Sequence, residues 1–121
     1  MIVHIVKRIE WMLAVERGTY AADSLRSEGF IHCSMLTQVI DTANRFYRGQ
    51  RDLVVLCIEE SWLTAELKYE APAKSRDEVP GDLFPHLYGE LNVAAVERVV
   101  ELPCEADGTF RLPDGLLERV R

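Results

Sequence analysis

Two short segments carry the residues of this 121-residue chain that could do chemistry, and the first spans residues 29–34. Its sequence, GFIHCS, follows a glycine with apolar and β-favouring residues, which predicts a short strand. Successive side chains of a strand point to opposite faces, so Phe30, His32 and Ser34 should share one face, and Ile31 and Cys33 the other. An imidazole beside a hydroxyl could bind a polar ligand or, with an acid, work as a hydrolase pair. A core-facing Cys33 thiol would instead behave as a small hydrophobe with a raised pKa.

The second segment, residues 84–89, reads FPHLYG. In an extended conformation it places His86 and Tyr88 on one face together with Phe84. Such a face can stack on a planar ring and hydrogen-bond its edge, and Gly89 would let a ligand or another backbone come close. An ordinary aromatic core strand explains the same pattern. Both interpretations stay open.

The chain has three histidines, His4, His32 and His86, and all of them fall in apolar or strand-like segments. A buried imidazole must satisfy two nitrogens and titrates near neutral pH, so three of them together indicate a shared cleft. Each could equally be a core histidine bonded to the backbone. A metal site from these three is geometrically feasible, but none has a neighbouring zinc motif, and we predict no metal.

One acid stands out, because Glu70 ends a predicted strand just before a loop at 71–81 that contains two prolines. A carboxylate at that position could reach a cleft, and the loop itself is expected on the surface. The alternative for Glu70 is a solvated surface charge.

Hydrophobic periodicity predicts the elements that would position these residues. Residues 8–17 and 36–47 carry apolar side chains at helical spacing, and Gly18 and Gly49 follow where helices end. Strands are predicted at 2–6, 29–34, 52–58, 67–70, 84–89 and 96–102, and 52–58 should be central because it is apolar on both faces.

The packing of these elements follows from the same patterns. Asp23 or Ser24 is expected to cap a short turn before Gly29, and an Asp107-Gly108 turn predicts that the C-terminal segment pairs back on the preceding strand. Strands mixed with two helices, not in a regular βαβ order, predict an α+β fold in one domain spanning residues 1–121. The expected buried helix positions are Ile9, Met12, Leu13 and, as a further candidate, Ala14 in the first helix and Val39, Ile40, Ala43, Phe46 and Tyr47 in the second.

Composition excludes several classes of function. A net charge of −6 and a pI near 5.0 argue against nucleic acid as a partner. No apolar run approaches the roughly 20 residues of a membrane helix, so no membrane association is expected. Three cysteines without a CxxC spacing favour a reduced, cytoplasmic setting. The oligomeric state stays open.

Several motifs resemble one known family, and they extend from Met1 to about Leu102. They are Val3-His4-Ile5, Trp11, Tyr20, Gly29-Phe30-Ile31-His32-Cys33-Ser34, Gln38, Ala43-Asn44-Arg45-Phe46-Tyr47, Leu53-Val54-Val55-Leu56 and Phe84-Pro85-His86-Leu87-Tyr88-Gly89. Together these motifs resemble the bacterial domain-of-unknown-function family 952. Its members are similar in fold to ADP-ribosyltransferases, which implies an ADP-ribosyltransferase-like α+β architecture of two facing β-sheets around a cleft for NAD, with two main helices.

The resemblance also implies roles for single residues. His32 looks like the transferase histidine that hydrogen-bonds the ribose beside nicotinamide, and His86 or Tyr88 would stack on the nicotinamide ring. Glu70 or another acid would resemble the glutamate that stabilises the oxocarbenium-like ribose. The chain lacks the Ser-Thr-Ser run of that superfamily and a Glu-x-Glu at the end of a late strand.

The expected function is therefore binding of NAD or a similar nucleotide and transfer of ADP-ribose, with NAD as a substrate and no resident cofactor. The first alternative is a non-catalytic module that binds a small ligand, and the second is a hydrolase built on His32 and Ser34. Candidate catalytic residues are His32 and Glu70, and candidate ligand-binding residues are His4, His32, Ser34, His86 and Tyr88.

Overall fold

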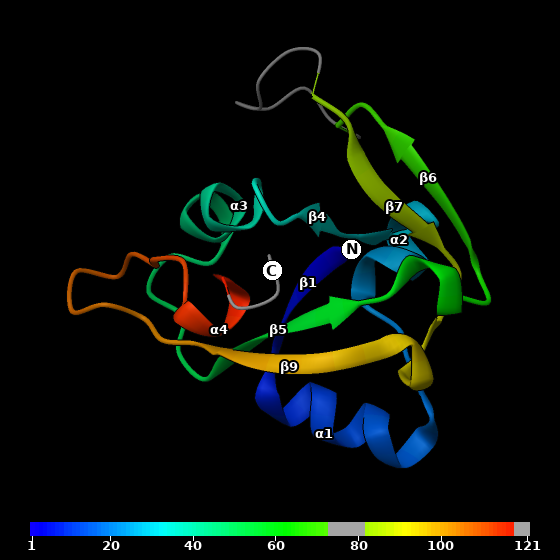
Figure 1. The fold of residues 1–121 in the computed structure, drawn as a ribbon, viewed down its shortest axis with the longest axis horizontal. Coiled ribbons are helices and arrows are strands. Elements are labelled where there is room, and N and C mark those ends of the chain that lie inside the picture. The colour runs from blue at the N-terminus through cyan, green and yellow to red at the C-terminus, as the bar shows by residue number, and fades with distance from the viewer. Residues whose placement is uncertain (73–81, 118–121) are drawn as a thin grey trace.

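The computed structural model describes residues 1–72 and 82–117 and has a mixed α+β architecture (Figure 1). The strands are β1 (Ile2–Lys7), β2 (Thr19–Tyr20), β3 (Ile31–His32), β4 (Ser34–Met35), β5 (Leu53–Ile58), β6 (Glu66–Glu70), β7 (Phe84–Tyr88), β8 (Leu91–Asn92) and β9 (Val96–Leu102). The helices are α1 (Arg8–Arg17), α2 (Asp23–Glu28), α3 (Val39–Phe46) and α4 (Asp114–Leu117), with short 3-10 turns η1 (Glu60–Trp62) and η2 (Val93–Ala95).

The largest sheet has four antiparallel strands in the order β4-β1-β5-β9. All six residues of β5 are buried, which confirms the prediction that this apolar run is a central strand. On one side β5 pairs with β1 along its whole length, from Ile2↔Ile58 to Lys7↔Leu53. On the other side it pairs with β9.

A three-stranded antiparallel sheet, in the order β3-β7-β6, carries the second histidine segment. It lies at the upper right of Figure 1, and β2 and β8 form a separate short pair. The predicted strand at 29–34 is divided between two sheets at Cys33: β3 pairs with β7, and β4 pairs with β1. The backbone N–H of Cys33 donates to the carbonyl of Pro85 at 3.0 Å, which holds the junction against β7.

Two apolar clusters fill the molecule, one on each face of the four-stranded sheet. The first receives Ile2 and Leu56 from the four-stranded sheet and Ile31 and Leu87 from the three-stranded sheet. The space between the two sheets is therefore largely packed with apolar side chains, where the family resemblance implied a cleft. The second cluster lies under α3 and includes Phe110 from the C-terminal segment.

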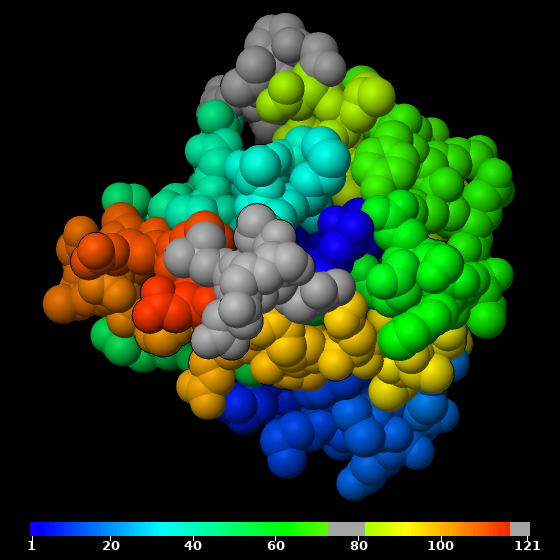
Figure 2. Space-filling model, viewed as in Figure 1, coloured from blue at the N-terminus to red at the C-terminus, as the bar shows by residue number. Residues whose placement is uncertain are grey.

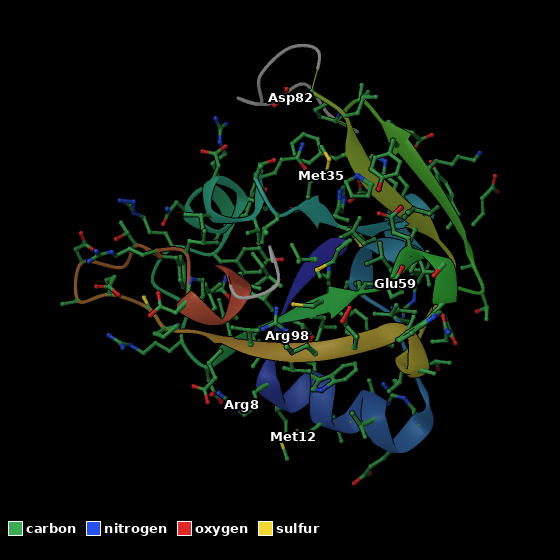
Figure 3. All side chains as sticks on the ribbon, viewed as in Figure 1. Arg8, Met12, Met35, Glu59, Asp82 and Arg98 are labelled. Atoms are coloured by element: carbon green, nitrogen blue, oxygen red, sulfur yellow. The ribbon has the colours of Figure 1, made fainter. Side chains whose placement is uncertain are left out.

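The first helix differs from prediction in the face that it buries. Its bounds and its left-handed C-cap at Gly18 are confirmed, and of its predicted apolar positions only Ala14 is buried. Ile9, Met12 and Leu13, predicted to be buried, are each about half exposed. Figure 2 shows α1 as the blue lower surface of the molecule, and Met12 points outward from it in Figure 3. The helix packs against the first apolar cluster through Ala14 and the partly buried Trp11, and its other apolar side chains are left exposed.

Other local predictions also need correction. The helix α3 begins at Val39 rather than Leu36, and Phe46 is 42% exposed although Val39 and Ala43 are buried as predicted. Neither Asp23 nor Ser24 caps α2, whose N-cap residue is Ala22.

The chain after β9 was predicted to pair back on that strand, but within residues 103–117, which the structure describes, no strand pairs with β9. A turn forms at Asp107-Gly108, where Gly108 N–H donates to the Glu105 carbonyl at 2.9 Å. The chain then runs to α4, and Arg98 on β9, labelled in Figure 3, donates to the carbonyl of Gly115. Most of the predicted loop at 71–81 falls outside the described residues.

Candidate functional site

One face of the three-stranded sheet brings the predicted site residues together. His32 on β3 lies opposite His86 on β7, which lies opposite Lys68 on β6. The neighbouring set of cross-strand paired residues points to the other face of the sheet, toward the first apolar cluster. It consists of Ile31, Leu87 and Leu67. The alternation therefore directs His86 away from the core cluster, together with Tyr88 and Glu70 at two-residue steps along β7 and β6.

Four rings pack on this face. Phe30 lies flat against His86, with centroids 4.0 Å apart and ring planes at 18°. The edges of His32 and Tyr88 approach Phe30 at centroid distances of 4.9 and 5.3 Å. His32 also meets His86 nearly perpendicularly at 5.5 Å. Phe30 and His86 are 7% and 2% exposed, so they form the floor of the cluster, whereas His32 is exposed and Tyr88 half-buried.

The carboxylate of Glu70 joins this ring cluster through two hydrogen bonds. Tyr88 Oη donates to Glu70 Oε1 at 2.6 Å, and His86 Nδ1 donates to the same oxygen at 2.8 Å. These two bonds lower the pKa of Glu70, the Tyr88 bond more than the His86 bond. The same hydrogen bond to Glu70 raises the pKa of Tyr88. Glu70 is therefore ionised at neutral pH, with a side chain that is 36% exposed.

A second acid and a cation border the cluster. His32 Nε2 lies 3.2 Å from both carboxylate oxygens of Glu28, the last residue of α2. Lys68 Nζ lies 4.8 Å from the centroid of the Tyr88 ring, a cation–π contact. The exposed rim of the cluster thus carries charges of both signs.

His4 lies behind this cluster and is joined to it through the backbone. Its Nδ1 is 2.6 Å from the carbonyl oxygen of His32, and its Nε2 is 3.1 Å from Tyr20 Oη. A carbonyl can only accept, so Nδ1 carries the proton and Nε2 accepts from the Tyr20 hydroxyl. Burial lowers the pKa of His4 to about 4, against the opposing effect of its bond to His32, so the ring is neutral at pH 7.

Ser34 does not join His32 at this site. Ser34 Oγ is buried and lies 3.5 Å from Thr42 Oγ1 of α3. Because the strand divides at Cys33, alternation no longer carries over from His32 to Ser34, which belongs to β4 of the other sheet. The hydrolase alternative loses the contact on which it depended. Cys33 is buried as predicted, and burial raises the pKa of its thiol to about 12.

Three contributors were missed from the sequence. Phe30 was placed on the His32 face, but its stacking on His86 was not foreseen. The sequence patterns assign no site role to Glu28 or Tyr20. For Glu28 a signal exists, because an acid four residues before a histidine on a turn can pair with that histidine. Tyr20 reaches His4 only through tertiary folding, because 16 residues separate them.

The arrangement offers a fixed carboxylate beside the half-buried ring of Tyr88 and the exposed imidazole of His32. Such a surface suits a planar ring with a positive charge on or next to it, because the ring can contact Tyr88 and His32 while Glu70 offsets the charge.

Within residues 1–72 and 82–117, no group of three or more His, Cys, Asp or Glu side chains is arranged to hold a metal ion. In the same part of the chain, no helix combines the length and apolar character needed to span a membrane.

The chain is thus a mixed α+β protein with antiparallel sheets and a histidine–carboxylate cluster on the smaller three-stranded sheet. It belongs to the family described as "Protein of unknown function (DUF952)", which matches residues 5–99. No curated protein matches the chain.

Solved structures of one relative, protein CC0527 from Caulobacter crescentus, have the same fold. The crystal structure is 38% identical over 96% of this chain and 97% of that one, with a TM-score of 0.83. The solution NMR structure is 37% identical over 94% of each chain, with a TM-score of 0.77. The family membership predicted from the histidine motifs is confirmed.

Proposed function

We propose that this protein binds NAD or a closely related nucleotide at the Phe30, His32, Glu70, His86 and Tyr88 cluster and transfers ADP-ribose to an acceptor. The observation that carries the proposal is the Glu70 carboxylate, held by Tyr88 and His86 beside the half-buried Tyr88 ring and the exposed His32 ring. The nicotinamide ring of NAD is planar and cationic. Its positive charge and flat shape match the surface that these residues form.

The floor and the rim of the cluster have different tasks in this proposal. Phe30 and His86 are buried and stacked, so they hold Tyr88 and Glu70 in place rather than contact the ligand over a wide area. Tyr88 and His32 present accessible edges to the nicotinamide and the adjoining ribose. The Glu28 carboxylate fixes the orientation of the His32 ring, whose hydrogen-bonding edge would position the ribose hydroxyls.

The chemistry would be a displacement at the ribose carbon that bears nicotinamide. The carbon–nitrogen bond breaks, and its electron pair leaves with nicotinamide, which departs as a neutral molecule. Positive charge grows on the ribose carbon and its ring oxygen, and the Glu70 carboxylate offsets it. A lone pair of the acceptor then forms the new bond to this carbon, and the acceptor proton passes to solvent.

A specific observation favours a second candidate, a module that binds the nucleotide without turning it over. Both hydrogen bonds to Glu70 end at Oε1, and they already take up hydrogen-bonding capacity of that oxygen. A carboxylate used in this way can be a structural clamp for Tyr88 and His86. In that case NAD would bind and be recovered unchanged.

Calorimetric titration with NAD tests the proposal. The unmutated chain should bind NAD, and His32→Ala should weaken binding roughly tenfold or more, equivalent to about 1.4 kcal/mol. Glu16→Gln, which alters an exposed residue of α1 outside the cluster, should leave binding unchanged. No detectable NAD binding by the unmutated chain would overturn the proposal.

Chromatography of the same mixtures distinguishes the two candidates. Release of nicotinamide that Glu70→Gln abolishes supports transfer. Intact NAD after long incubation with a protein that binds it supports the module.

A further inference from the structure

A pocket of about 260 Å³ opens beside β1, at the point where the chain leaves the four-stranded sheet. Only Ile2 and Val3 of β1 pair with β4, because the chain turns toward β7 at Cys33. The outer edge of β1 is therefore not paired with β4 from His4 to Lys7, and these four consecutive residues line the pocket. Alternate residues of a strand direct their N–H and C=O groups to opposite edges, so this edge offers the pocket both donors and acceptors.

The inner wall of the pocket accepts hydrogen bonds. His4 and Tyr20 line it and are 7% and 5% exposed. Because His4 Nε2 already accepts the Tyr20 proton, Tyr20 Oη faces the pocket with lone pairs only. The inner wall therefore suits a ligand that brings its own N–H or O–H donors.

The charges around the pocket are predominantly negative. Its lining includes the carboxylates of Glu10 and Asp23 and one ammonium group, that of Lys7. Within the described ranges, no hydrogen bond or ion pair to another residue engages the Glu10 or Asp23 side chain. Burial and then the Glu10 charge raise the pKa of Tyr47, which also lines the pocket, so the negative field of Glu10 extends across it.

We propose that this pocket binds a small organic cation, an amine or guanidinium compound whose N–H groups donate to Tyr20 Oη and to backbone carbonyls of β1. Glu10 and Asp23 offset its charge. Anions are disfavoured by the same two carboxylates. His32 borders both this pocket and the ring cluster, but the proposal does not require the nucleotide site.

Titration with agmatine, which carries a guanidinium and an amine, tests the proposal by NMR of the ¹⁵N-labelled chain. Millimolar binding is expected, with shifts centred on the amides of residues 4–7 and 20–24. Glu10→Gln and Asp23→Asn should each weaken binding roughly two- to fivefold, as expected for the loss of one partly solvated charge. Glu16→Gln, on the same helix as Glu10 but not in the lining, is the matched control and should change nothing.

Inorganic phosphate is the opposite-charge probe and should not shift these amides. The proposal is overturned if phosphate binds as well as agmatine, if the double variant of Glu10 and Asp23 binds agmatine undiminished, or if agmatine shifts no amide of β1. Failure of NAD to bind while agmatine binds would overturn the proposed function and leave this pocket assignment intact.

Discussion

At the scale of single residues, the two hydrogen bonds that meet at Glu70 Oε1 set the protonation state of the candidate site. Tyr88→Phe removes the bond that lowers the pKa of Glu70 most, so this pKa should rise toward its ordinary value. Carboxyl-detected NMR titration of Glu70 measures the change. Tyr69→Phe on β6 alters a tyrosine of the opposite sheet face and should leave the Glu70 pKa where it was. An unshifted Glu70 in Tyr88→Phe would contradict the assigned hydrogen bond.

His4 makes stability depend on pH in a defined window. Its pKa is about 4 in the folded chain against 6.5 for an ordinary histidine, so between these values the unfolded chain binds a proton that the folded chain does not. Stability should therefore fall as pH decreases from 6.5 toward 4, by about 2 kcal/mol between pH 7 and pH 5. The pKa of Glu70 is lowered on folding, so its contribution to stability is present above its ordinary value of 4.5 and is lost only as pH falls below that value. Urea unfolding at the two pH values measures the loss, and His4→Gln should remove most of it. An equally steep loss in His4→Gln would show that another group is responsible.

Strand alternation predicts much of the candidate site. His86 and Tyr88 share a face with His32 because each lies on a short extended segment, and cross-strand pairing then brings Glu70 to them. The same rule fails for Ser34, because it assumes one continuous strand. No local pattern in residues 29–34 reveals that the chain changes sheets at Cys33, since this choice depends on Pro85, 52 residues further along the chain.

At the scale of elements, Gly89 lies between β7 and β8 and packs against Ala65, the residue before β6. A Cβ built on Gly89 would lie 2.8 Å from the Cβ of Ala65, and its φ of 156° is one that side chains rarely adopt. The close approach predicted for this glycine is therefore to another part of the chain. Gly89→Ala should destabilise the fold by about 1–3 kcal/mol, in the range of other overpacked sites.

A compensating change separates the clash from backbone strain. Ala65→Gly removes the opposing Cβ, so adding it to Gly89→Ala should restore part of the lost melting temperature. Gly49→Ala is the matched control, because Gly49 has a φ of 80° but no atom within 4 Å of its Cβ position. No recovery in the double variant would mean that contact with Ala65 is not the cause.

The first helix gives a prediction opposite to the one that its sequence favours. Met12 is 55% exposed, so Met12→Glu should change stability by no more than about 0.5 kcal/mol. Ala14 is fully buried on the same helix, and Ala14→Leu should cost about 1–3 kcal/mol through overpacking. Thermal unfolding of both variants checks the contrast. A large loss in Met12→Glu would show that this face is covered in solution.

At the scale of the whole molecule, the α+β class and most strands follow from hydrophobic patterns. The central position of β5 is encoded in six consecutive apolar residues. The bounds of β9 are those predicted from the sequence, residues 96–102. The grouping of strands into sheets is not encoded in this way, because it depends on long-range pairing. The C-terminal segment shows the difference: its turn at Asp107-Gly108 forms, but Phe110 packs under α3 instead of extending a hairpin.

The most direct test of the nucleotide proposal is a crystal structure of the chain with an NAD analogue whose nicotinamide–ribose bond cannot break. The proposal predicts the nicotinamide ring against Tyr88 and His32, with the ribose carbon that bears it next to the Glu70 carboxylate. An analogue bound elsewhere on the molecule, or with its phosphates against Glu70, would contradict it.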